Sequence, residues 1–179
     1  MSDLLDRAVD AALALARERP WGDIVLRDIA AAADAPLAQL YPLAPSKAAL
    51  LDHMSRRFDL QALEAGAGDD LHDRLFDVVM ARVEAMEPHR SALSAIARSE
   101  DPARLALRLP RTARALLEAA GVDTQGSKGA VRIAAMTALW TRVLQVWRDD
   151  EGALNRTMAE IDRRLRQMRS GLKRLGAGF

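Results

Sequence analysis

The side chains that most often perform catalysis or bind metals are scarce and scattered in this sequence. It has no cysteine and only three histidines, His53, His72 and His89. Metal sites need ligands at short, fixed spacings, and these positions offer none. Asp73 follows His72 directly, but neighbouring residues on a helix point about 100° apart, so these two side chains do not face each other. We therefore expect no enzyme active site, no metal and no cofactor.

The composition predicts an all-α protein. Of 179 residues, 50% are hydrophobic, 28% are charged and only 4% are aromatic. Alanine, leucine and arginine are abundant while β-branched residues are scarce, which favours helices over a sheet. No apolar run approaches the ~20 residues that a membrane span needs. The absence of cysteine fits a reducing compartment, so we expect a cytoplasmic protein.

Apolar spacing and helix-breaking residues place eight or nine helices along the chain. Pro20 ends the first helix, Ser46 is a suitable N-cap for the fourth, and Gly121 ends the seventh. The predicted helices cover about 3–19, 26–33, 37–41, 46–65, 71–85, 88–96, 102–120, 127–149 and 153–174. The two short helices, 26–33 and 37–41, are joined by a tight turn and follow a longer helix. This is a helix-turn-helix arrangement, in which the second short helix enters a DNA major groove and the first one braces it.

The order of residues in this segment resembles the N-terminal DNA-binding domain of the TetR family of bacterial repressors. The motifs that carry the resemblance are Ala11-Ala12-Leu13, Glu18, Trp21, Leu26-Arg27-Asp28-Ile29-Ala30, Leu37-Ala38-Gln39-Leu40-Tyr41 and Pro45-Ser46-Lys47-Ala48-Ala49-Leu50-Leu51. The resemblance implies a TetR-like fold and a homodimer that binds a palindromic operator and releases it when a small apolar molecule enters the C-terminal core. It also implies a DNA-binding module over residues 1–45 and a ligand-binding and dimerisation domain over residues 46–179.

The resemblance further implies which residues meet DNA. Arg27 would lie at the start of the bracing helix, and Leu37 and Gln39 on the helix that contacts the bases. Tyr41 and Lys47 match positions that meet phosphates. An amide can pair with a base edge, while a hydroxyl and an ammonium group can hold the backbone. The alternative is that Tyr41 is a core aromatic and Lys47 a solvated residue of a first helical turn.

Four positions depart from the family pattern. Asp34 stands where the turn usually has glycine, Pro36 replaces the usual Ser or Thr cap, Pro42 replaces a basic residue or histidine, and Ala44 replaces phenylalanine. Residues 1–60 also hold only seven Lys and Arg against nine Asp and Glu. Because neutralising phosphates dominates non-specific DNA affinity, this charge balance predicts DNA binding that is weak or narrow.

The C-terminal part offers candidates for a ligand pocket and for a dimer interface. The pocket candidates are Phe76, Met80, Met86, His89, Met136 and Trp140, since Met adapts to varied apolar ligands. The interface candidates, on the helices 127–149 and 153–172, are Leu139, Val143, Trp147, Met158, Ile161 and Leu165. The alternative for the pocket set is that these residues form ordinary core.

A second resemblance supports a different function. Segments 82–90, 147–152 and 157–165 are similar to lipid-binding proteins of ubiquinone biosynthesis, which share the TetR-like fold but have lost DNA binding. On the last helix, an apolar stripe is flanked by basic residues. The stripe consists of Leu154, Met158, Ile161, Leu165, Met168 and Leu172. The alternative function is therefore a lipid- or quinone-binding accessory protein whose C-terminal helix lies on a membrane surface. The stripe would instead be buried if that helix packs on its neighbours.

Overall fold

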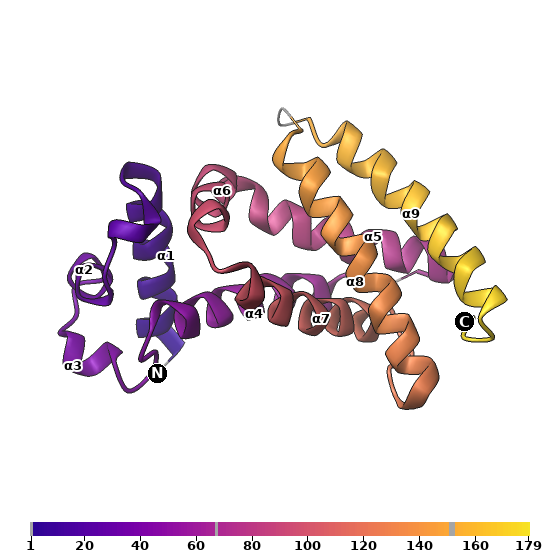
Figure 1. The fold of residues 1–179 in the computed structure, drawn as a ribbon, viewed down its shortest axis with the longest axis horizontal. Helices are drawn as coiled ribbons and strands as arrows, with labels where there is room; N and C mark the ends of the chain where they lie inside the picture. The colour runs from indigo at the N-terminus through magenta and orange to yellow at the C-terminus, as the bar shows by residue number, and fades with distance from the viewer. Residues whose placement is uncertain (1, 67, 151–152) are drawn as a thin grey trace. The chain divides into compact units, whose positions relative to one another are not determined.

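The computed structural model describes residues 2–66, 68–150 and 153–179. Over these residues the chain forms nine α-helices and two short 3₁₀ helices and no strand, so the all-α prediction is confirmed (Figure 1). The helices divide into two compact units. Unit 1 comprises Met1–Arg57 and Pro88–Leu105, and unit 2 comprises Phe58–Glu87 and Ala106–Phe179.

Unit 1 is built around α1 (Ser2–Glu18), which packs against α2, α3 and α6. The apolar stripe of α1 is buried, with Ala8 and Val9 fully covered and Leu13 1% exposed. The other elements of this unit are the 3₁₀ helix η1 (Trp21–Asp23), α2 (Leu26–Ala32), α3 (Leu37–Leu40), the first part of α4 (Lys47–Glu64) and α6 (Arg90–Ser99).

Unit 2 contains α5 (Leu71–Met86), most of α7 (Pro102–Ala119), α8 (Gly126–Arg148) and α9 (Asn155–Arg174). Helices α8 and α9 pack along each other, and α9 also packs on α5 (Figure 1). Asp150 holds the start of α9, because its carboxylate accepts hydrogen bonds from the backbone N–H of Thr157 (2.8 Å) and from its hydroxyl (2.7 Å). Predicted connector residues Glu151 and Gly152 lie outside the described residues.

Two predicted helix ends are confirmed. The Ser46 hydroxyl accepts a hydrogen bond from the N–H of Ala49 at 3.1 Å, as expected of an N-cap. Gly121 follows α7 with φ +77°, a conformation that glycine adopts without strain.

Two 3₁₀ helices were not predicted. Pro88 does not begin an α-helix; it lies in η2 (Glu87–His89), and α6 begins at Arg90. The short 3₁₀ turn links α5 to α6, a common use of this geometry. The other, η1, follows Pro20, where we expected only a break, and it is anchored by Trp21, which is 4% exposed. Over the described residues, no helix is both long and apolar enough to cross a membrane.

Candidate DNA-binding and ligand-binding sites

The two short helices of unit 1 form a compact helix-turn-helix. Ile29, Ala30 and Leu40 point inward and are at most 1% exposed, and α1 packs against both helices. The turn between them contains Asp34 at φ +50°, the left-handed conformation expected where the family pattern has glycine. Pro36 precedes α3 as its N-cap and forms no side-chain cap hydrogen bond.

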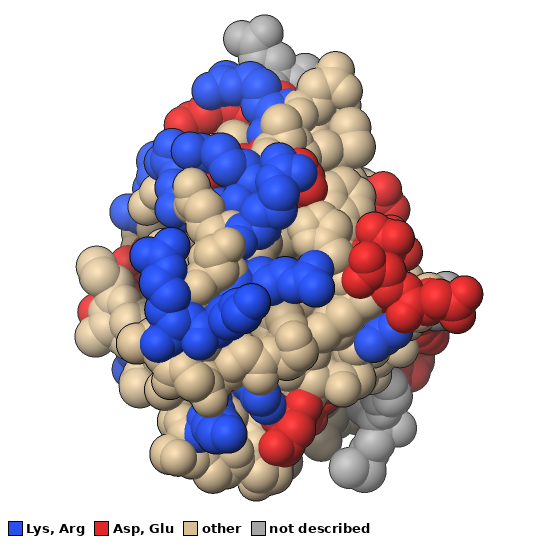
Figure 2. All heavy atoms as spheres, turned by 90° about the vertical axis from the view of Figure 1, so that its right-hand side faces the viewer, with Lys and Arg blue, Asp and Glu red and all other residues tan. Residues whose placement is uncertain are grey.

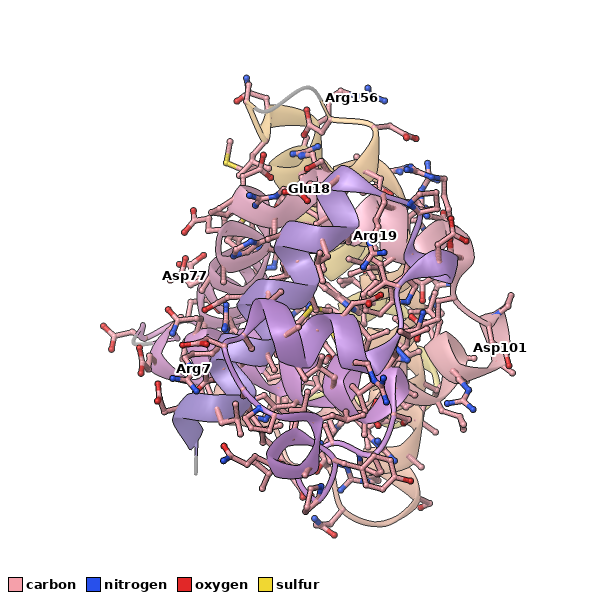
Figure 3. The ribbon with its side chains drawn as sticks, turned by 90° about the vertical axis from the view of Figure 1, so that its left-hand side faces the viewer. Arg7, Glu18, Arg19, Asp77, Asp101 and Arg156 are labelled. Carbon is pink, nitrogen blue, oxygen red and sulfur yellow. The ribbon has the colours of Figure 1, made fainter. Side chains whose placement is uncertain are left out.

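The start of α2 is held by a charged pair. The carboxylate of Asp28 accepts a hydrogen bond from the N–H of Val25 at 3.0 Å and pairs with Arg19 at 2.7 Å. The Val25 hydrogen bond is the main reason that the pKa of Asp28 is lowered; partial desolvation opposes the shift, and Arg19 adds to it. Glu18 and Arg19 lie at the far end of α1 from Arg7 (Figure 3). The pair therefore links the segment after α1 to the first turn of α2.

Three of the five predicted DNA-contacting residues have exposed side chains that are available for contacts with DNA. The side chains of Arg27, Gln39 and Tyr41 are exposed and make no hydrogen bond or ion pair with any residue that the structure describes. Tyr41 is 56% exposed, so it is not a core aromatic. Leu37, at the start of α3, is half-buried.

Lys47 serves the fold of unit 1. Its ammonium group donates to the backbone carbonyls of Trp21 (2.7 Å) and Ile24 (2.6 Å), and it lies 4.7 Å from the centre of the Trp21 ring. Burial lowers the pKa of Lys47, and the nearby carboxylates of Asp23 and Asp28 partly offset this. An ammonium group has three donors, and two of those of Lys47 are used by the carbonyl of Trp21 in η1 and the carbonyl of Ile24 directly after it.

Most of the predicted pocket residues lie in the core of unit 2. Met80, Met86, Met136 and Trp140 are at most 7% exposed, while Phe76 is half-buried. His89 lies in unit 1, where its Nδ1 is 3.4 Å from the Arg17 guanidinium. The sequence prediction thus combined residues from two compact units.

The core of unit 2 also contains a buried arginine that the sequence prediction missed. Arg82 is 4% exposed, and its Nε donates to the carboxylate of Asp59 on α4 at 2.7 Å. The same guanidinium lies 2.9 Å from the sulfur of Met86 and 4.8 Å from the centre of the Trp140 ring. Burial lowers the pKa of Arg82, and Asp59 opposes the shift. No spacing rule singles out such a residue, because its partner Asp59 is distant in sequence.

The predicted interface residues lie mainly between α8 and α9 of the same chain. Their exposed fractions are small: Leu139 3%, Val143 0%, Trp147 2%, Ile161 0% and Leu165 1%. Met158 is half-buried. The indole N–H of Trp147 also donates to Glu87 at 2.7 Å. A second chain would therefore meet other, outward-facing residues of these helices.

Histidine, aspartate and glutamate side chains form no cluster suited to a metal ion within the described ranges. A scan against models of known protein families finds no match. A search of curated protein sequences also finds none.

Solved structures do match almost the full length of the chain. It is similar to a TetR transcriptional regulator from Rhodococcus sp. RHA1, with a TM-score of 0.68 and 19% identity over 93% of this chain and 95% of that one. It is also similar to a TetR family transcription regulator from Marinobacter aquaeolei VT8, with a TM-score of 0.50 and 17% identity over 92% and 94% of the two chains. This chain therefore has the fold of the TetR-type transcriptional regulators.

Proposed function

We propose that this protein is a homodimeric transcriptional regulator of the TetR type, acting in the cytoplasm as a ligand-released repressor. In this proposal residues 1–45 bind operator DNA, and residues 46–179 bind a small apolar ligand and dimerise. The observation that carries the proposal is the helix-turn-helix itself. Its inward-facing residues are buried. The side chains of Arg27, Gln39 and Tyr41, on α2 and at α3, are exposed and have no hydrogen-bond or ion-pair partner in the described chain.

Each exposed side chain suits one kind of DNA contact. A guanidinium binds phosphate oxygens, and a tyrosine hydroxyl can add another backbone contact. The amide of Gln39 can pair with an adenine edge in the major groove. The engaged ammonium of Lys47 has at most one further donor, so we assign it a minor part in DNA affinity.

Ligand release would work through α4, which begins at Lys47 beside the helix-turn-helix segment and carries Asp59 into the core of unit 2. A ligand among Met86, Trp140 and their neighbours would disturb the Asp59–Arg82 pair, since Arg82 contacts both residues. The resulting shift of α4 would alter the spacing of the two DNA-binding modules, which must match the operator half-sites.

The dimer would form through the outer faces of α8 and α9, because the residues between them are already buried. Ala138 and Gln145 on α8 and Ala159 on α9 are exposed there. Analytical ultracentrifugation over a range of protein concentrations tests this, with Ala138→Glu expected to yield a monomer. A monomer at every concentration in the unaltered protein would overturn the proposed dimer.

The lipid-binding alternative is not favoured. Lysine and arginine side chains gather on the face of the molecule that Figure 2 shows, but most of the apolar stripe is buried within the chain. Ile161 is 0% exposed, Leu165 1%, Met168 7% and Leu172 1%, while Leu154 and Met158 are half-buried. The stripe packs on α8 and α5 and so is unavailable to insert into a bilayer.

DNA selection from a random pool, followed by fluorescence anisotropy at several salt concentrations, tests the regulator proposal. With so few free cations on the DNA-binding module, we expect log K to fall with log salt at a slope of about −2 to −4, since each neutralised phosphate contributes about 0.9. Arg27→Ala should weaken binding to all sequences and flatten the slope by about 1 for each copy removed. Gln39→Ala should relax the preference at one base position.

The matched control is Arg98→Ala. Arg98 is exposed on α6 and lies outside the helix-turn-helix. Its side chain forms no hydrogen bond or ion pair with the described residues. It removes the same charge, so binding should stay within about twofold of the unaltered protein. If no sequence is enriched at low salt, or if Arg98→Ala and Arg27→Ala weaken binding equally, the proposed DNA-binding surface is wrong.

A further inference from the structure

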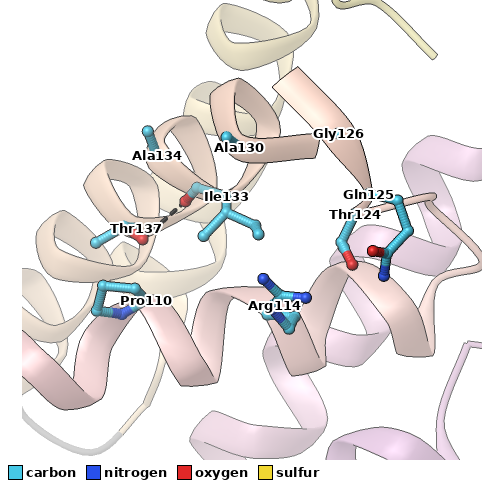
Figure 4. A pocket seen from close by; sticks show the side chains of 9 residues that line it. All are labelled: Pro110, Arg114, Thr124, Gln125, Gly126, Ala130, Ile133, Ala134 and Thr137. Atoms are coloured by element: carbon cyan, nitrogen blue, oxygen red, sulfur yellow. Dashed lines mark hydrogen bonds between the residues drawn. The ribbon is translucent and has the colours of Figure 1, made fainter. Parts of the chain in front are cut away.

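A hollow of about 540 Å³ lies on unit 2 between α7 and α8 (Figure 4). Pro110 and Arg114 of α7 form one wall, and Ile133 and its neighbours on α8 form the other. The volume of the hollow falls within the range of sites that hold small organic molecules. Predicted pocket residues such as Met86 and Trp140 do not line it, so this is a separate place in the fold.

The backbone of the loop before α8 lies very close to the first turn of that helix. An added Cβ at Gly129 would lie 2.1 Å from the backbone of Thr124, so only glycine, which has no Cβ, avoids a clash at this position. The N–H of Gly129 donates to the carbonyl of Gln125 at 3.0 Å and so ties the loop to the first turn of α8. The loop thereby places the Gln125 side chain beside the same hollow as Arg114 (Figure 4).

Some polar side chains that line the hollow already form hydrogen bonds within the chain, and others do not. The Thr124 hydroxyl donates to Glu118 at 2.6 Å, and the Thr137 hydroxyl donates to the carbonyl of Ile133 at 2.7 Å. The guanidinium of Arg114 forms no hydrogen bond or ion pair with the residues that the structure describes, and neither does the side-chain amide of Gln125. A guanidinium and an amide, both with unused donors, therefore border one hollow.

The remaining walls are apolar. Pro110, Ile133, Ala130 and Ala134 present only hydrocarbon side chains to a bound molecule. Apolar walls stabilise a hydrocarbon group by removing it from water, while a guanidinium pairs with a carboxylate through two parallel hydrogen bonds. Glu118 is the nearby opposite charge on α7, but its carboxylate is engaged by Thr124 and forms no ion pair with Arg114 within the described chain.

We propose that this α7–α8 hollow binds a small amphipathic organic acid, with its carboxylate on Arg114 and Gln125 and its hydrocarbon part along Pro110 and Ile133. The site depends on the fold of unit 2 and not on DNA binding. It can therefore be present or absent whatever the outcome for the proposed regulator.

Isothermal titration calorimetry of the full chain with octanoate, and with 1-octanol as the neutral probe of equal chain length, tests the proposal. We expect octanoate to bind at least about fivefold more tightly than octanol, because only the acid pairs with Arg114. Arg114→Ala should weaken octanoate binding about fivefold to tenfold and leave octanol unchanged. Ala134→Trp, at an exposed position in the hollow, should abolish binding of both probes.

The matched control is Arg104→Ala, which removes an exposed arginine of the same helix that does not line the hollow. It should bind octanoate as the unaltered protein does. The proposal is overturned if the unaltered protein binds neither probe, if it binds them equally, or if Arg104→Ala lowers the affinity as much as Arg114→Ala. Helical circular dichroism identifies any variant that has failed to fold, and Arg114→Gln then replaces Arg114→Ala in the comparison.

Discussion

The buried ion pair of unit 2 gives the sharpest test of how the core is held together. Asp59 on α4 is the carboxylate that the structure pairs with Arg82 on α5, at 2.7 Å, with side chains 13% and 5% exposed. The guanidinium also meets the sulfur of Met86 and the hydroxyl of Thr112, at 2.9 Å and 3.4 Å. Asp59→Asn preserves the shape of the side chain and removes the negative charge beside the Nε of Arg82.

The expected loss follows from that burial. Removing one partner of a buried ion pair costs about 3–5 kcal/mol, because the remaining charge stays desolvated. We expect about 3 kcal/mol for Asp59→Asn, since the amide oxygen can still accept one hydrogen bond and the Trp140 ring still faces the guanidinium. For a chain of this size that corresponds to a fall in Tm of about 6–12 °C.

Urea unfolding followed by tryptophan fluorescence measures the loss. Trp140 and Trp147 lie in unit 2, so replacing Trp21 by Phe makes the emission report that unit alone. The control is the double variant Asp59→Asn, Arg82→Met, which removes both charges of the pair and should recover part of the stability. A loss below about 1 kcal/mol for Asp59→Asn, or a double variant less stable than the single one, would refute the reasoning.

Three further predictions concern other charged or strained positions. Burial raises the pKa of Glu160, but hydrogen bonds from Arg164 and Arg163 outweigh it and leave the pKa lowered. Glu160→Gln should therefore cost about 1 kcal/mol at pH 7, and the difference should disappear as pH falls below the ordinary glutamate pKa, in urea titrations at each pH. Desolvation, with Arg17 and Arg57, lowers the pKa of His89, while Asp10 opposes the shift. Stability should fall as pH drops below about 6.5, where the unfolded chain binds the proton first, and His89→Gln should flatten this dependence. At Asp34, with φ +50°, Gly should be tolerated and Val should cost about 1–2 kcal/mol of unfolding free energy; equal stabilities would contradict the left-handed turn.

Helix positions followed from the sequence because local signals determine them. The spacing of apolar residues, the Ser46 cap and the breaks at Pro20 and Gly121 each act within one or two turns of the chain. Predicted ends consequently agree with the structure to within a few residues. The two 3₁₀ helices escaped prediction because a single turn of three residues leaves no periodic pattern.

The contacts made by side chains were harder to predict. Arg82 and Asp59 meet only because the fold brings these parts of α4 and α5 within side-chain reach, and no local sequence pattern predicts that. The predicted dimer-interface residues are buried within their own chain for a similar reason. An apolar stripe identifies which face of α8 or α9 is buried but not whether its own chain or a second chain covers it, and here the own chain does.

The helix-turn-helix shows how charges in unit 1 are shared between folding and DNA binding. Arg19 pairs with Asp28, Arg57 with Asp10, and Lys47 with two carbonyls, so these cations already stabilise the module. Arg27, by contrast, is exposed and unpaired within the described chain. Salt-dependent affinity depends on the number of cations that meet phosphates and not on the number in the sequence. A module with so few free cations would distinguish its operator mainly through hydrogen bonds and shape, so base substitutions in the operator should change its affinity more than moderate changes in salt do.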